Sequence, residues 1–358
     1  MTATGQQLLL SSIDDYLGPG ETRFFSRGYQ RAQYGVRDVR VNPALSEGVC
    51  VTATADISYP ADWSRKRSGV DLAPHLSTVD VLVLGVQLAE SHLVRAHRLD
   101  AAGQRAMRLR KVSLRAGNAP QEELADLPLS AALVRSEPDR EAEGGNRSVY
   151  DCAVGGLRVR CEIEHPTARG TAVDIQDIHA PGARVHDSLA DVLGAAESRF
   201  YGEGFKRRRH TIHDVRVDVG ALTAEADARF TDEAGSPVPA EGIEGTAQPA
   251  ISLVDAFVVN LQLAQVLMYE LDSLTRESSN TLWMMQTVLE APRGRRTLRE
   301  PGEPLRTQTG VTGHRLLRLR GGAWRSVDLR GALAGITMRA AFAHELPEDA
   351  AAAALRSA

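Results

Sequence analysis

The sequence predicts an α+β protein that consists of two tandem copies of one unit, each an antiparallel sheet around a long helix. The first observation is a repeat: residues 12–41 align without a gap on residues 188–217, with 13 identities in 30 positions. The second is the match of residues 74–93 to residues 249–268, both strongly apolar. Because an internal repeat constrains the whole architecture, it is considered before any single element.

A third, shorter match extends the duplication toward the end of each copy. The segment LRVRCEIEH, residues 157–165, aligns on ITMRAAFAH, residues 336–344. The chain has 358 residues, a length that suits about two domains. We therefore expect an N-terminal unit over residues 1–175 and a C-terminal unit over residues 176–358.

Each copy opens with a short amphipathic helix, which ends at Gly28 in the first copy and at Gly204 in the second. The segments that follow, residues 37–59 and 213–230, alternate apolar and polar side chains. This period of two is typical of half-buried strands.

A long apolar helix comes next in each copy, over about residues 78–97 and 253–275. A helix that is apolar nearly all round is a buried helix. More strands are expected after it, over residues 105–117, 148–165, 280–291, 314–322 and 336–345. One buried helix with strands on both sides in sequence is the layout of the hot-dog fold, so we expect a double hot-dog. The Pro-, Gly- and charge-rich stretches 118–147 and 293–313 are expected to be loops.

Composition excludes several classes of function. Lys plus Arg number 42 and Asp plus Glu number 46, a net charge of −4, so we expect no nucleic-acid partner. The three cysteines form no C-x-x-C pair, which indicates buried thiols in a reducing compartment and neither a disulfide framework nor a zinc site. The N-terminal residues lack the basic segment of a signal peptide, and the apolar stretches contain polar residues. We expect a cytoplasmic protein with no membrane contact, no metal and no cofactor.

The start of each long helix carries the first candidate site residues. Known hot-dog proteins place their active sites between units near this point, where free N–H groups can polarise a thioester carbonyl. Asp80 and Asp255 are candidate general acids or bases, and Ser77 and Ser252 are candidate substrate contacts. The alternative is structural, since S-x-x-D before an apolar helix is also a capping box.

His75 makes the two copies unequal, because the second copy has Ala250 at the aligned position. The string from His75 to Asp80 resembles the H-P-x-L-L-D segment of polyketide dehydratase domains. However, the H-x-x-x-G-x-x-x-x-P motif of those dehydratases is absent from both copies. His75 is therefore either a catalytic candidate or a loop histidine.

His210 and His213 replace Tyr34 and Arg37 of the first copy. Either histidine titrates in the range that a catalytic base needs, and the pair could flank a substrate. A metal site needs more ligands than two histidines, so none is expected.

Polar and basic side chains are candidates for substrate binding. Gln87 and Gln262 lie inside the buried helices and need hydrogen-bond partners, so they either serve the cleft or tie the helices together. Basic side chains could hold the phosphate of a sugar phosphate or of a carrier arm, although a basic run is more often a solvated surface. The candidates are Arg65, Lys66, Arg207 and Arg209.

Three segments resemble the avirulence D (AvrD) family: SIDDYLGPGETRFFSRGYQR, YPADWSRK from Tyr59 to Lys66, and PHLSTVDVLVLGVQLAE from Pro74. Members occur in plant-pathogenic pseudomonads and in actinomycetes and are implicated in making syringolides, small acyl-sugar lactones. The resemblance implies a reaction that joins a β-ketoacyl thioester to a ketose such as xylulose and closes a butenolide ring. The γ-butyrolactone synthases of the A-factor type, which acylate a keto-sugar phosphate, also look like duplicated hot-dogs.

The expected function is therefore that of an acyltransferase and cyclising enzyme of secondary metabolism. Its partners would be an acyl thioester, carried by coenzyme A or an acyl carrier protein, and a sugar or sugar phosphate. Two alternatives stay open: a dehydratase, isomerase or cyclase that acts on a carrier-bound acyl or polyketide chain, and a non-catalytic protein that binds an acyl metabolite. The duplication already supplies the usual hot-dog dimer, so the chain is expected to be a monomeric pseudo-dimer or a homodimer.

Overall fold

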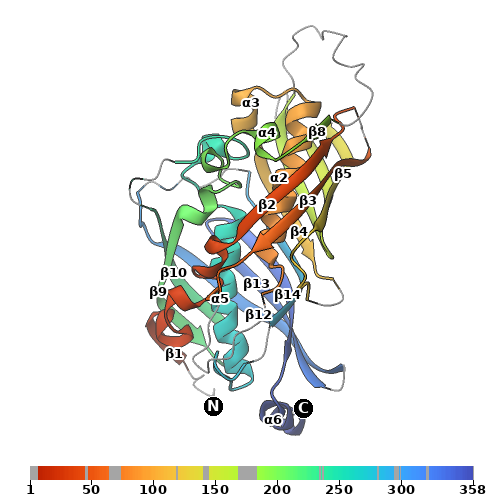
Figure 1. The fold of residues 1–358 in the computed structure, drawn as a ribbon. Helices are drawn as coiled ribbons and strands as arrows, with labels where there is room; N and C mark the ends of the chain where they lie inside the picture. The colour runs from red at the N-terminus through yellow and green to blue at the C-terminus, as the bar shows by residue number, and fades with distance from the viewer. Residues whose placement is uncertain are drawn as a thin grey trace, which may run out of the picture.

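The computed structural model describes residues 7–44, 47–63, 74–117, 120–139, 145–167, 184–233, 235, 238–279, 282–293, 298, 300–319 and 322–357. These residues form one antiparallel sheet of 14 strands that packs against two long helices, α2 (Thr78–Ala96) and α5 (Leu253–Leu271). Figure 1 shows α2 in the upper part of the molecule and α5 in the lower part. The expected α+β class is confirmed.

The two halves of the sheet have the same strand order. In the first half the order is β2, β3, β5, β6, β7, β4, and in the second it is β9, β10, β12, β13, β14, β11. Helix α2 contacts all six strands of the first half, and α5 contacts all six of the second. The bounds in the first half are β2 (Gln33–Val41), β3 (Gly48–Ser58), β4 (Arg108–Arg115), β5 (Leu127–Pro138), β6 (Gly145–Val154) and β7 (Leu157–Pro166). Those in the second half are β9 (Arg208–Asp218), β10 (Thr223–Asp232), β11 (Leu282–Glu290), β12 (Leu305–Leu319), β13 (Gly322–Leu333) and β14 (Ile336–Glu345).

Both long helices begin at a capping box. The Oγ of Ser77 accepts a hydrogen bond from the N–H of Asp80 at 3.2 Å, and the Asp80 carboxylate accepts from the N–H of Ser77 at 2.9 Å. Ser252 and Asp255 repeat the pair at 3.1 and 2.9 Å. These bonds satisfy N–H groups that a helix start leaves without intrahelical partners. The expected helix starts are confirmed, whereas α5 ends at Leu271 and not near residue 275.

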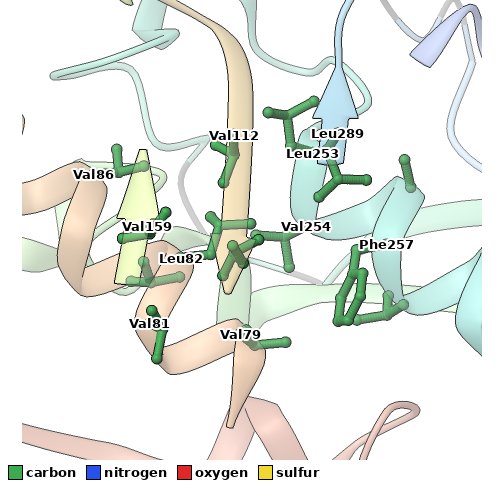
Figure 2. Packing of buried hydrophobic residues seen from close by; sticks show 14 of the residues in the cluster. Val79, Val81, Leu82, Val86, Val112, Val159, Leu253, Val254, Phe257 and Leu289 are labelled. Atoms are coloured by element: carbon green, nitrogen blue, oxygen red, sulfur yellow. The ribbon is translucent and has the colours of Figure 1, made fainter. Parts of the chain in front are cut away.

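The two halves share one hydrophobic core. They meet where β4 and β11 pair, with Ser113 opposite Val288. Figure 2 shows Val79 and Leu82 of α2 in the same packed cluster as Val254 of α5. Unfolding one half would therefore expose apolar surface of the other, so we expect the halves to fold together.

The opening strand of each copy pairs with the other copy. Strand β1 (Gln7–Ser12) pairs with β9, and β8 (Arg184–His186) pairs with β2. The two pairings share one register, since Leu10 lies opposite Val215 and its aligned partner His186 lies opposite Val39. The exchange is therefore symmetric.

We name residues 7–31 arm one and residues 184–207 arm two. Arm one runs on through the short helix α1 (Asp14–Leu17) and arm two through α4 (Ala190–Leu193). The arms meet at the rings of Tyr29 and Phe205, which stack with centroids 6.3 Å apart. The predicted boundary between residues 175 and 176 lies outside the described residues and stays a prediction.

Other contacts show that each arm covers the helix of the other copy. The Tyr16 hydroxyl of arm one donates to Glu270 of α5 at 2.6 Å. The Arg95 guanidinium of α2 donates to the backbone carbonyl of Asp191 in arm two at 3.3 Å. The structure also has the short helices α3 (Ala101–Ala106) and α6 (Glu348–Ser357). No helix in the described ranges is long and apolar enough to cross a membrane.

The prediction of a loop over residues 118–147 is wrong for residues 127–138, which form β5, and for residues 145–147, which begin β6. The inward-facing residues of β5 alternate with more exposed ones, and the strand pairs with β3 and β6. Charged residues and prolines on either side obscured this period in the sequence. The expected loop over residues 293–313 likewise contains the beginning of β12.

Candidate active site

The start of helix α2 holds a buried carboxylate between two phenols. Asp80 accepts a hydrogen bond from the hydroxyl of Tyr34 at 2.8 Å and another from the hydroxyl of Tyr59. Tyr34 belongs to β2 and Tyr59 follows β3, so two adjacent strands bring both phenols to the helix start. Burial raises the pKa of Asp80, and the hydrogen bonds that it accepts oppose this shift. Burial, and then the charge of Asp80, raise the pKa of both tyrosines, which therefore stay protonated donors.

Arm two adds a cation from the other copy. The Nζ of Lys206 lies 4.7 Å from the centre of the Tyr34 ring, within range of a cation–π contact. The same ammonium pairs with Glu203 at 2.7 Å. We name Asp80, Tyr34, Tyr59 and Lys206 site one, a group to which both copies contribute.

An aromatic cluster borders site one. Trp63 packs against Tyr59 with ring centroids 5.5 Å apart, and Phe24 of arm one contacts Trp63 at 5.3 Å. His75 is half-buried and meets the Trp63 ring edge-on at 5.8 Å. His75 thus lies near the start of α2 and packs against an aromatic ring, and its catalytic role stays a prediction.

The start of α5 holds the aligned carboxylate in a different setting. Asp255 accepts from both the N–H and the Oγ of Ser252, at 2.9 and 2.8 Å. It also lies 3.4 Å from the guanidinium of Arg208, a side chain of which 1 % is exposed. Burial raises the pKa of Asp255, and the positive charge of Arg208 opposes that shift. We name Asp255 and Arg208 site two.

Arg208 is held on all sides. Its guanidinium donates to the Asp232 carboxylate at 2.7 Å, to the carbonyl of Ala250 at 3.0 Å and to the side chain of Gln248 at 3.1 Å. The first copy has Ala32 at the aligned position, so site one lacks this cation. In site two, the guanidinium that pairs with Asp255 is thus buried and bonded to other groups of the protein, as is typical of a structural ion pair.

His210 occupies the position aligned with Tyr34 but bonds to a different partner. Its Nε2 lies 2.9 Å from the amide nitrogen of Gln262, which is also within hydrogen-bond distance of the backbone carbonyls of Phe25 and Val258, so these three acceptors share its two hydrogens. The Oε1 of Gln262 accepts from Arg23 at 2.6 Å. Gln262 thus ties arm one to α5, which is one of the two roles expected of it; Gln87 is buried at the aligned place in α2.

His213 does not lie beside His210. Residues 208, 210 and 212 of β9 are buried, whereas His213 is half-buried on the opposite face of the strand. Two strand residues three apart project to opposite faces, so the two histidines cannot flank one ligand. Within the part of the chain that the structure describes, no three His, Cys, Asp or Glu side chains are grouped as metal ligands would be.

Two of the four basic candidates bond to nearby residues, and the other two lie outside the described residues. Arg207 donates to the backbone carbonyl of Glu197, and Arg209 bonds to Gln30 and Glu233 at 3.2 and 3.3 Å. The remaining candidates, Arg65 and Lys66, lie outside the described residues.

Sequence reasoning missed Tyr34, Tyr59 and Arg208 as partners of the two aspartates. The sequence held a signal for two of them, because the two copies differ at these positions. Tyr34 is aligned with His210, and Arg208 is aligned with Ala32. Tyr59 had no such signal, since only the fold shows that the end of β3 lies at the helix start.

A polar pocket of about 350 Å³ lies elsewhere, on the strands where the halves meet. Lys111 and Glu290 pair across it at 3.4 Å, so part of its charge is balanced internally. None of the residues proposed from the sequence belongs to its lining, which consists of Arg110, Lys111, Arg147, Glu162, Glu290 and Arg293.

The fold and these sites define a duplicated α+β protein with one tyrosine-lined carboxylate and one that is closed by an arginine. The chain belongs to the AvrD family: the family described as Pseudomonas avirulence D protein (AvrD) matches residues 8–347. The resemblance seen in the sequence is thereby confirmed. No curated protein matches the chain.

Solved structures with a similar course of the chain are distant. A conserved hypothetical protein from Mycobacterium tuberculosis with a double hot-dog fold has 11% identity and a TM-score of 0.40, and 96% of each chain is covered. A 12:0-ACP thioesterase from Umbellularia californica has 12% identity and a TM-score of 0.39, with 78% of this chain and 91% of that chain covered. A putative MaoC domain protein dehydratase from Chloroflexus aurantiacus has 8% identity and a TM-score of 0.35, with 96% and 95% covered.

Proposed function

We propose that the chain is a biosynthetic enzyme that joins a β-ketoacyl thioester to a ketose and closes a butenolide ring, with its chemistry at site one. Membership of the AvrD family supports this class of reaction. The repeated strand order, with one helix held by each half, favours a double hot-dog scaffold. The observation that carries the choice of site is Asp80, a buried carboxylate that accepts hydrogen bonds from two phenols.

In the first step, a hydroxyl of the ketose would attack the thioester carbonyl carbon. Asp80 acts as the general base through Tyr34 or Tyr59, because the phenol passes its proton to the carboxylate as it takes the proton of the sugar hydroxyl. The C–O bond forms, the C–S bond breaks, and the thiolate leaves as a thiol with the proton that Asp80 collected. The ester of the β-keto acid remains.

In the second step, the acidic carbon between the two carbonyls would lose a proton to the same base and attack the ketone of the sugar. The new C–C bond closes the five-membered ring, and loss of water gives the butenolide. Both steps build negative charge on a carbonyl oxygen, which the ammonium of Lys206 and the N-terminus of α2 stabilise.

The test is product formation by the intact chain. β-Ketoacyl thioesters of coenzyme A and of an acyl carrier protein are incubated with a panel of ketoses, and thiol release and product mass are recorded. The wild type is expected to give an adduct with the mass of thioester plus ketose, less thiol and water. Tyr34→Phe and Tyr59→Phe should each lower the rate by ~10-fold or more, since each removes a proton carrier.

Tyr16→Phe is the matched control, because Tyr16 of α1 also donates to a carboxylate, but to Glu270 of α5 and not to Asp80. Its rate should equal that of the wild type. Conversion of a 3-hydroxyacyl thioester to an enoyl product without any adduct would replace the proposal with a dehydratase. Binding of acyl thioester in calorimetry with no thiol release for any ketose would replace it with a non-catalytic binder.

A further inference from the structure

The junction between arm one and α5 is built around a neutral histidine. The amide nitrogen of Gln262 lies 2.9 Å from Nε2 of His210 and can only donate, so we assign the single proton of the neutral ring to Nδ1 on this contact. Burial, and then the charges of Arg27 and Arg23, lower the pKa of His210 to about 3, so the ring is neutral near pH 7. His210 therefore presents an N–H donor at its Nδ1.

Three N–H donors at this junction have no hydrogen-bond partner in the described part of the chain. They are the Nδ1 of His210, the Nε of Arg23 and the Nη1 of Arg27. His210 and Arg23 are both buried, each with 4 % of its surface exposed. A buried donor without a partner costs about 1–3 kcal/mol, so three in one place favour a bound group that only accepts hydrogen bonds.

The charge at this junction is also positive. After burial, the largest cause of the lowered pKa of His210 is the positive charge of Arg27 and Arg23. The pKa of Arg27 is itself lowered, first by burial and then by the charge of Arg209. The carboxylate bonded to Arg23 is Asp14, whose side chain is half-exposed; the exposed Glu21 also acts on both arginines, and Glu233 pairs with Arg209 at 3.3 Å. A half-exposed carboxylate is screened by water and balances only part of this charge.

The aligned junction between arm two and α2 lacks this charge excess. There Arg199 pairs with the buried carboxylate of Glu90 at 3.4 Å, and α5 has the uncharged Gln265 at the position of Glu90. Glu203 of arm two likewise stands where arm one has Arg27. The cationic junction is therefore a property of the second half and not of the repeated scaffold.

We propose that arm one and β9 bind a phosphate group beside α5, through Arg23, Arg27 and the Nδ1–H of His210. A phosphate offers acceptors only, which matches three donors, and guanidinium groups bind its oxygens with two parallel hydrogen bonds. This site is separate from site one and does not depend on the proposed reaction. The phosphate of a sugar phosphate and a phosphate of coenzyme A present the same chemistry to it.

The test is binding of inorganic phosphate to the full chain, measured by calorimetry and by the shift in Tm at constant ionic strength, with chloride as the reference salt. Wild type is expected to bind saturably. Arg27→Gln should weaken Kd by ~10-fold or more, the loss expected for one charge-assisted hydrogen bond. Arg23→Lys keeps the charge but loses the paired donors, and should weaken binding as well.

Arg160→Gln is the matched control, because Arg160 is an exposed arginine on β7 that pairs with Asp151. It should bind phosphate as the wild type does. Absence of saturable phosphate binding by the wild type would overturn the proposal, and so would equal binding by Arg27→Gln; the three donors would then be bonded to water.

Two further pairs of ligands identify the source of the phosphate. Tighter binding of xylulose 5-phosphate than of xylulose would assign the site to a sugar phosphate. Tighter binding of coenzyme A than of pantetheine would assign it to the thioester carrier. Both outcomes support the site, and both are read without turnover, so a failure here is distinct from a failure of the reaction at site one.

Discussion

The two long helices begin with the same capping box but differ in what surrounds the aspartate. At α2, Asp80 accepts hydrogen bonds from two phenols and has no cation bonded to it among the described residues. At α5, Asp255 faces Arg208, which is bonded to four groups of the second half. The two halves have the same strand order, and at the aligned position of Ala32 and Arg208 only the second half has a cation beside its aspartate.

Burial is common to the two aspartates, so burial alone does not distinguish a candidate catalytic carboxylate from a structural one. Both aspartates are buried, and burial raises the pKa of both. A carboxylate in a fixed ion pair keeps its charge and its geometry, whereas one that is bonded to phenols can exchange protons with them.

Arg208→Met should have the largest effect on stability. It leaves Asp255 buried without its cation, so the free energy of unfolding in urea should fall by ~3–5 kcal/mol. Adding Asp255→Asn removes the unpaired charge and should recover part of that loss. A loss below ~1 kcal/mol for Arg208→Met would mean that site two is not a structural centre.

Gln262→Leu should have the second largest effect on the free energy of unfolding. It removes the acceptor of Arg23 and the donor to His210, so we expect a loss of about 2 kcal/mol in the free energy of unfolding. Gln87→Leu, at the aligned place in α2, should cost less than ~1 kcal/mol. Equal losses would show that the two helices are held in the same way.

The stability of the second half should depend on pH below neutrality. The pKa of His210 is lowered to about 3 in the folded chain, whereas an unfolded histidine titrates near its ordinary value of about 6.5. Below pH 6.5 the unfolded chain binds a proton that the folded chain does not, so stability falls as pH falls, by up to ~1.4 kcal/mol per pH unit.

His210→Gln removes this contribution, and its stability curve between pH 6.5 and 4 should be flatter than that of the wild type. The contribution of His165, whose pKa burial lowers to about 4, has the same sign, whereas those of Asp80 and Asp255, whose pKa values burial raises, have the opposite sign; all three are common to wild type and variant. Parallel curves for wild type and variant in urea titrations at several pH values would show that His210 is protonated in the folded chain.

Lys206→Gln should have the smallest effect on stability and makes arm two resemble arm one, which has Gln30 at the aligned position. The ion pair with Glu203 is partly exposed, so less than ~1 kcal/mol should be lost. The rate of adduct formation should nevertheless fall, because Lys206 contacts Tyr34 at site one. An unchanged rate would remove Lys206 from the site.

Much of the fold follows from local patterns in the sequence. The capping boxes fixed the helix starts at residues 78 and 253, and the repeat predicted that both halves share one order of elements. The exchange of arms could not be predicted, because the period of β1 shows that it is a strand but not which strand it pairs with. Strand β5 was hidden by the charged residues around it.

The candidate site could be predicted only in part, because local sequence patterns identify the aspartate but not its distant partners. Asp80 stood out because its position in the helix is local information. Its phenolic partners are 46 and 21 residues away along the chain, and only the packing of β2 and β3 on α2 brings them to it. The role of Arg208 was likewise hidden in a basic run that looked like solvated surface.

The most direct test of the account is a matched pair of substitutions, Asp80→Asn and Asp255→Asn, each measured for adduct formation and for unfolding in urea. We predict that Asp80→Asn lowers the rate by ~100-fold or more while the chain stays folded, because a general base is lost. Asp255→Asn should keep a rate within ~10-fold of the wild type and lose more stability, because the buried Arg208 loses one of its two carboxylate partners. An Asp80→Asn enzyme that works as well as the wild type, beside an inactive but stable Asp255→Asn, would contradict the assignment of chemistry to site one.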